Sequence, residues 1–153
     1  EQDLTRPIRH EDETCTTTWR IDQHYPMEKN SQQYPGAEWI SVGVLTPIDF
    51  YALPYRCFYS KDVRNLFMAG RNISVTHIAL GSTRVMRTCG MIGEVVGMAA
   101  SICTKRNVLP RDIYTTYFAD LQELMRKGAG RTDVPYTQFY HQVDRTGHQA
   151  EDR

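Results

Sequence analysis

Residues 65–106 read NLFMAGRNISVTHIALGSTRVMRTCGMIGEVVGMAASICTKR, and this stretch decides the fold. It opens with an apolar run, Leu66 to Ala69, that ends at Gly70, a pattern typical of a buried strand breaking into a loop. A helix is expected to begin at residues 81–83, with Ser82 as its N-cap. The stretch therefore predicts a strand, a loop and a long helix.

The expected helix is unusual in its glycines. Gly90, Gly93 and Gly97 lie on or close to one face, together with Ala100. Each glycine inside a helix costs about 1 kcal/mol relative to alanine. The pattern therefore favours close approach of another backbone, or of a flat ligand, to this face.

Composition argues against several classes of partner. The 153 residues carry 18 basic and 18 acidic side chains, so no net field favours nucleic acid or an anionic membrane. No apolar run approaches the roughly 20 residues that span a bilayer. The four cysteines contain no Cys-x-x-Cys pair, which argues against zinc and thioredoxin-type sites. A reducing compartment is favoured, and we expect a cytoplasmic protein.

The rest of the chain predicts strands before the central stretch and a helix after it. Thr14–Asp22 and Trp39–Leu45 have the composition of strands. Asn107 is expected to close the central helix in a left-handed conformation, and a second helix is expected over Pro110–Lys127. Residues 129–153 are polar and predict an extended or disordered tail. The isolated chain is thus predicted to be α+β.

Two short segments have both a functional and an ordinary interpretation. The run His10-Glu11-Asp12-Glu13 suggests metal ligands, but a solvated charged loop is the commoner explanation, and we assign no metal site. The aromatic-rich segment Asp49–Tyr59 is typical of packed extended chain. Alternatively it forms a wall facing a substrate, in which Tyr55 and Arg56 supply the polar groups.

A strand, a glycine turn and a helix N-terminus together favour the binding of an anion or a dipole. Unpaired backbone N–H groups and the helix dipole point toward such a ligand. These features do not choose between a flavin, a phosphate and a carboxylate. The dinucleotide-binding motif Gly-x-Gly-x-x-Gly is absent, because the helix glycines have a different spacing. Any FAD site in this chain is therefore half of a site.

Four runs of sequence carry a resemblance to a known family. They are LPYR at 53–56, SK at 60–61, NLFMAGR at 65–71 and THIALGSTRVMRTCG at 76–90. Together they resemble the C-terminal part of bacterial FAD-dependent oxidoreductases of the glutathione-reductase-like superfamily, in a group sometimes labelled xanthan lyases. The expected helix over 110–128 is similar to that group too, whereas the N-terminal third and the tail match less clearly.

The resemblance implies a division of the chain. In such proteins an N-terminal part with Gly-x-Gly-x-x-Gly binds the ADP half of FAD, and a returning strand and helix complete the α/β, Rossmann-type FAD-binding domain. Residues 1–55 would be the end of a β-rich substrate domain, 56–128 the returning segment and 129–153 the tail. The implied partners are FAD, a small-molecule substrate and an N-terminal FAD-domain portion missing from this sequence.

The resemblance also implies cofactor-binding residues. The strand end near the ribityl and pyrophosphate groups matches Ala69, Gly70 and Arg71. Many relatives have an acidic residue where this chain has Arg71, whose guanidinium suits the pyrophosphate instead. The helix start below the flavin pyrimidine edge matches Gly81, Ser82 and Thr83. On the same helix lie Arg84 and Arg87, of which one would face FAD and the other a neighbouring carboxylate; the alternative is that both lie on the surface.

The candidates for catalysis are His77, Arg56 and Tyr55. His77 suits proton transfer near neutral pH, and the alternative is a structural histidine that holds its loop. The resulting prediction is the C-terminal segment of an FAD-dependent oxidoreductase that transfers a hydride through the flavin. The rival prediction is a non-catalytic binding or structural module that keeps the strand–helix scaffold. Lyase chemistry rests on a label alone, since no set of catalytic bases for it is identifiable.

Overall fold

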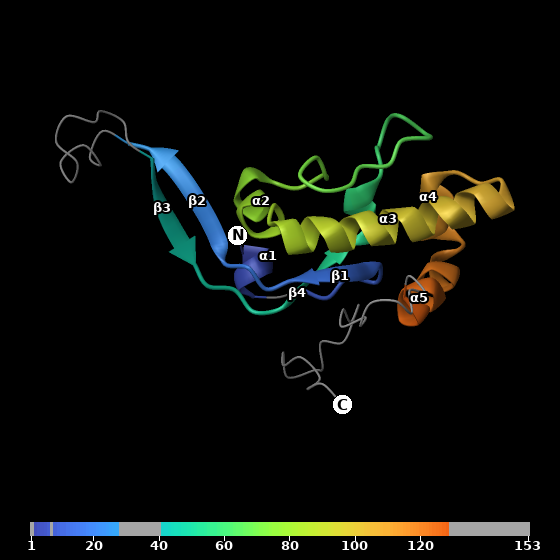
Figure 1. The fold of residues 1–153 in the computed structure, drawn as a ribbon, viewed down its shortest axis with the longest axis horizontal. Coiled ribbons are helices and arrows are strands. Elements are labelled where there is room, and N and C mark those ends of the chain that lie inside the picture. Colours follow the sequence, from blue (N-terminus) through green and yellow to red (C-terminus); the bar gives the residue numbers. More distant parts are fainter. Residues whose placement is uncertain (1, 7, 28–40, 129–153) are drawn as a thin grey trace.

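The computed structural model describes residues 2–6, 8–27 and 41–128, which form two small sheets and several helices (Figure 1). In chain order the elements are α1 (Gln2–Thr5), β1 (Glu13–Thr17), β2 (Ile21–Pro26), β3 (Ser41–Thr46), β4 (Tyr51–Pro54), the 3-10 helix η2 (Tyr55–Phe58), α2 (His77–Thr83), α3 (Met86–Arg106), α4 (Pro110–Thr115) and α5 (Phe118–Lys127). The chain therefore mixes helix and strand, as expected of an α+β protein.

Each sheet is an antiparallel pair of strands. β1 pairs with β4, and its register shifts between Glu13 and Thr16. β2 pairs with β3 from Ile21 opposite Thr46 to Pro26 opposite Ser41, and Figure 1 shows this ribbon extending away from α3. The single strand predicted over residues 14–22 is thus two strands in different sheets. β1 lies against α3, whereas β2 lies against α2.

The main core lies under α3. This helix directs Ile92, Val95, Ala99 and Ile102 into the core, and their spacing of three and four residues makes one apolar face. The same cluster contains Cys15 and Leu53 from the first sheet, and Ile113 and Leu121 from α4 and α5. Residues on both sides of position 55 therefore share one core.

The predicted start of the long helix at residues 81–83 is wrong. A separate helix, α2, precedes it, with Thr76 as N-cap accepting a hydrogen bond from Ala79 N–H at 3.3 Å. α3 begins only at Met86, and the two helices are bent by 94°. In the described residues no single helix is long and apolar enough to cross a membrane; α2 and α3 reach that length and composition only when taken together.

Three further boundaries can be compared with the sequence. Asn107 closes α3 with φ 54°, as predicted. The second predicted helix is divided into α4 and α5 at Thr116 and Tyr117. The predicted strand over residues 66–69 is reduced to an isolated bridge between Tyr59 and Phe67. The predicted tail over residues 129–153 lies outside the described residues, as does the start of the strand predicted over 39–45.

Candidate functional site

The glycine loop after residue 69 lies against the beginning of α3. Gly70 has φ 86°, a left-handed conformation that favours glycine. A Cβ built on Gly70 would lie 3.9 Å from the Cβ of Cys89, in the first turn of α3. The first hydrogen bond of α3 joins Cys89 N–H to the Val85 carbonyl at 2.9 Å, so the N–H groups of residues 86–88 precede the helical ladder. The predicted loop and a helix N-terminus are thus brought together, although that helix starts at Met86.

The structure buries all three residues that were predicted to contact the cofactor at the helix start, Gly81, Ser82 and Thr83. Ser82 Oγ donates to the Trp19 carbonyl at 2.7 Å, and the Thr17 hydroxyl donates to the Ser82 carbonyl at 2.8 Å. A Cβ on Gly81 would lie 2.7 Å from the Asp22 carbonyl oxygen. Gly81 thus permits close packing of α2 on β2, and these residues end α2 instead of beginning the long helix.

The two arginines beyond α2 differ in their surroundings. Arg84 forms an ion pair with Asp22, 2.9 Å between Nη2 and Oδ2, so it is the arginine that faces a carboxylate. Asp22 also lies 2.8 Å from His24 Nε2. Arg87 is exposed in the first turn of α3, two residues before Cys89, whose side chain faces the Gly70 backbone closely enough to meet an added Cβ at 3.9 Å. Of the pair, Arg87 is therefore the better placed to meet a ligand at that turn.

His77 lies at the surface as the first residue of α2. Its ring contacts the Tyr25 ring edge-on, with 5.6 Å between centroids, and so links α2 to the β2–β3 ribbon. This contact fits the alternative in which His77 holds its loop. It leaves the imidazole accessible, so the catalytic role stays a prediction.

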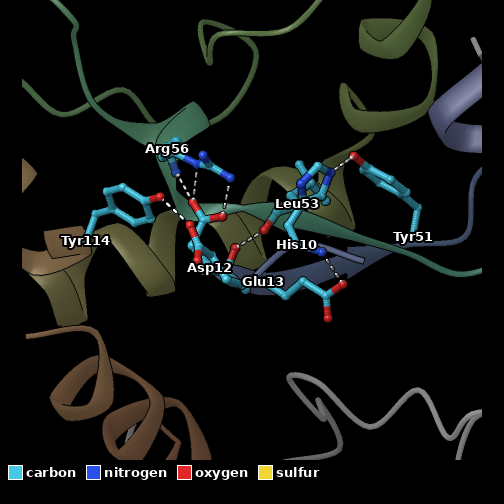
Figure 2. Close-up of polar contacts among 9 residues, drawn as sticks. His10, Asp12, Glu13, Tyr51, Leu53, Arg56 and Tyr114 are labelled. Carbon is cyan, nitrogen blue, oxygen red and sulfur yellow. Dashed lines mark hydrogen bonds and ion pairs between the residues drawn. The ribbon is translucent and has the colours of Figure 1, made fainter. Parts of the chain in front are cut away.

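Tyr55 and Arg56 are held by packing and by an acidic residue. Tyr55 is fully buried, its hydroxyl donates to the Pro110 carbonyl at 2.8 Å, and burial raises its pKa. A hydroxyl in this position stays protonated and serves packing. Arg56 donates from its backbone N–H and from Nε to Oδ2 of Asp12, at 2.9 and 3.0 Å, and from Nη2 to Oδ1 at 3.0 Å. Figure 2 shows these hydrogen bonds between Arg56 and Asp12, with Tyr114 beside Arg56.

The acidic run at residues 10–13 is not a solvated loop throughout. Asp12 is 1% exposed and Glu13 is 7% exposed. Glu13 accepts from His10 N–H at 3.0 Å (Figure 2) and also pairs with Arg9. Glu11 accepts from the Tyr114 hydroxyl. Asp12 was missed by sequence reasoning because its partner is 44 residues away. Within the part of the chain that the structure describes, no three histidine, cysteine or acidic side chains are grouped to hold a metal.

Comparison with known proteins gives one match. The family model described as FAD-dependent oxidoreductase matches residues 1–125 of the 153. No curated protein and no solved structure matches the chain. The match spans both the first sheet and the helices around α3.

Proposed function

Because the chain belongs to the FAD-dependent oxidoreductase family, we propose that it is the C-terminal segment of such an enzyme and completes a Rossmann-type FAD site. In this proposal the loop at Ala69, Gly70 and Arg71 meets the ribityl and pyrophosphate groups, and the first turn of α3 meets the flavin pyrimidine edge. The observation that carries it is the position of Gly70, where an added Cβ would lie 3.9 Å from the Cβ of Cys89, so that the glycine loop lies beside the N-terminus of a 21-residue helix.

The residues where the glycine loop lies beside the first turn of α3 suit FAD. The N–H groups of residues 86–88, which precede the helical hydrogen bonds, and the helix dipole would stabilise negative charge, which a reduced flavin carries at N1 and its C2 carbonyl. Arg87 adds positive charge to the same turn, and the exposed Arg71 offers a guanidinium to the pyrophosphate. FAD, when bound, supplies the hydride chemistry; this chain supplies orientation and electrostatics.

The glycine face of α3 supports the idea that another segment completes the domain. No described atom lies within 4 Å of a Cβ built on Gly90, Gly93 or Gly97, outside the helix itself and the chain neighbours of each glycine. Close packing inside the described chain therefore does not explain these glycines. We assign the face to the N-terminal FAD-domain portion, because a bare helix surface allows backbones to approach closely.

The finer parts of the proposal concern the parent enzyme. Residues 1–55 would end its substrate domain, its substrate would be a small molecule, and its location would be cytoplasmic. The alternative is a non-catalytic module. That alternative is favoured by Ser82, whose hydroxyl and carbonyl are both bound inside the chain at a position predicted to meet the cofactor.

Flavin titration tests the proposal. The purified 153-residue chain should bind FAD weakly or not at all, whereas the parent protein should retain it stoichiometrically. Tight binding by the chain alone contradicts the segment proposal. A parent gene without Gly-x-Gly-x-x-Gly after an N-terminal strand favours the module.

A further inference from the structure

Two adjoining hollows lie between η2, the loop that follows it and α4. Their volumes are about 420 and 360 Å³, within the usual range of small-molecule sites. They share three lining residues, Ser60, Lys61 and Arg111. The larger hollow is completed by Arg56, Tyr59, Met68, Ser74, Tyr114 and Thr115. The smaller one is completed by Arg64, Leu109 and Asp112.

The lining of these hollows is rich in cations. Arg56, Lys61 and Arg111 line the larger hollow, and among the described residues no carboxylate lines it. Arg64 adds a cation to the smaller hollow, where Asp112 is the acidic residue. One oxygen of Asp112 already accepts from Leu109 N–H at 2.8 Å. The joined hollows therefore present more hydrogen-bond donors and positive charge than the chain itself balances.

Two of the guanidinium groups are held in place before any ligand arrives. Asp12 accepts from Nε and Nη2 of Arg56, and this guanidinium lies 4.9 Å from the centre of the Tyr114 ring, so that two neighbours fix its position. Arg111 Nη2 donates to the Lys61 carbonyl at 3.0 Å, and its guanidinium lies 5.9 Å from the centre of the Tyr59 ring. Fixed guanidinium groups bind oxyanions well, because little side-chain freedom is lost on binding.

The Asp12 carboxylate offsets the charge of Arg56, but Lys61, Arg64 and Arg111 still leave the joined hollows with more positive charge than Asp112 balances. Asp12 lies behind Arg56, is 1% exposed and does not line either hollow. Glu11 is engaged by the Tyr114 hydroxyl at the rim. The cations that line the larger hollow are therefore Arg56, Lys61 and Arg111.

We propose that the joined hollows bind a small molecule through a phosphate or carboxylate group, held by Arg56, Lys61 and Arg111. The serine hydroxyls of Ser60 and Ser74 supply neutral donors at the same surface. None of these five residues belongs to the proposed flavin contacts at Gly70, Arg71 and α3. The proposal does not rest on FAD binding, and it assigns a ligand surface to a part of the chain that the flavin proposal leaves unused.

The test titrates the flavin-free 153-residue chain with inorganic phosphate, succinate and ADP at constant ionic strength, followed by NMR or calorimetry. Saturable binding of phosphate or succinate is expected, and Arg111→Gln and Lys61→Gln should each weaken it about tenfold, the scale of one charge-assisted hydrogen bond. Phosphate and succinate distinguish the two kinds of oxyanion. Binding of ADP alone, weakened by the same two substitutions, would mean that the site takes a phosphate carried on a larger molecule. If none of the three ligands binds saturably, the proposal is overturned.

The matched control is Arg126→Gln. It removes an exposed arginine of α5 that pairs with Glu123 and lies outside both hollows. It should leave the affinity unchanged. Arg111 and Lys61 are exposed, so both variants should fold, and their melting temperatures should show it. A dissociation constant above about 10 mM for the unsubstituted 153-residue chain overturns the proposal. Equal affinities in all three variants also overturn it.

Discussion

Asp12 and Arg56 form three hydrogen bonds with one another across 44 residues, two from the arginine side chain and one from its backbone N–H. The Asp12 carbonyl also accepts from Tyr55 N–H at 2.7 Å. The buried carboxylate thus ties the segment before β1 to the turn that begins η2, and so fixes the position of the Arg56 guanidinium.

Asp12→Asn should destabilise the fold. The amide keeps the shape but loses the charge and turns an acceptor into a donor that faces the donors of Arg56. We expect a loss of about 1–3 kcal/mol in the free energy of unfolding, below the value for a fully buried pair because the Arg56 side chain is 45% exposed. Urea denaturation measures it. Glu123→Gln, which removes an exposed carboxylate paired with Arg126 and Lys127, is the control and should change stability much less.

Alkaline pH should destabilise the chain through Cys15. Burial raises the pKa of this thiol from about 9 to about 12. The folded state therefore holds the proton more tightly than the unfolded state, and this contribution is complete below about pH 9 and is lost as the pH rises toward 12. Urea denaturation under reducing conditions should show stability falling over that window, by up to about 1.4 kcal/mol per pH unit.

The control for the alkaline effect is Cys15→Ala, which should lower stability at neutral pH but flatten the dependence above pH 9. Some slope should remain, because burial also raises the pKa of Cys57 to about 11. A slope equal to that of the unmodified chain would show that Cys15 is not its source.

Alanine substitution should separate two kinds of helix glycine. Gly81→Ala forces a Cβ to within 2.7 Å of the Asp22 carbonyl oxygen, and should destabilise the chain by about 1–3 kcal/mol. Gly93→Ala meets no described atom within 4 Å and should stabilise the isolated chain by up to about 1 kcal/mol. Thermal melts of both variants test this. A destabilising Gly93→Ala in the isolated chain would mean that the glycine face packs against this chain's own residues.

The glycine face should behave differently in the parent protein. Gly93→Leu there should lower both the melting temperature and the flavin content, because the added side chain occupies the proposed contact surface, at a typical cost of about 1–3 kcal/mol. Unchanged melting and flavin content would show that no segment approaches this face closely.

His77→Gln in the parent enzyme should separate catalysis from structure. A catalytic histidine predicts full FAD content with flavin reduction slowed by about 10²-fold or more. A structural one, acting through Tyr25, predicts loss of FAD or stability together with activity. Stopped-flow reduction and bound-flavin absorbance distinguish the two, with His24→Gln on the neighbouring strand as a control. Full FAD content with a near-normal reduction rate would rule out both roles.

Local signals predicted the end of the long helix well but not its start. Asn107 closes α3 because its short side chain tolerates a left-handed conformation. At the other end, Ser82 has the side chain of an N-cap, but it lies near the end of α2, and α3 begins after Val85, which has no side-chain cap. Ser82 bonds to Trp19 and Thr17, more than 60 residues away, which no local pattern shows.

Burial of charge was equally hidden from the sequence. A charged run such as residues 10–13 is usually solvated. Asp12 can be buried because Arg56, which is distant in sequence, donates hydrogen bonds to its carboxylate. The predicted strand over residues 66–69 failed for a related reason. A strand needs a run of paired residues along an edge, and among the described residues this segment forms one isolated bridge, between Tyr59 and Phe67, with backbone hydrogen bonds to Phe58 and Ser60.

The hydrogen bonds of Thr17 set an order in which the chain acquires its structure. Its hydroxyl donates to the Ser82 carbonyl, 65 residues later, and accepts from the Thr88 hydroxyl, 71 residues later. The first strand emerges from the ribosome long before the helix that covers it, and closing so long a loop slows folding. During synthesis β1 therefore stays without the helix that covers it until α3 has emerged.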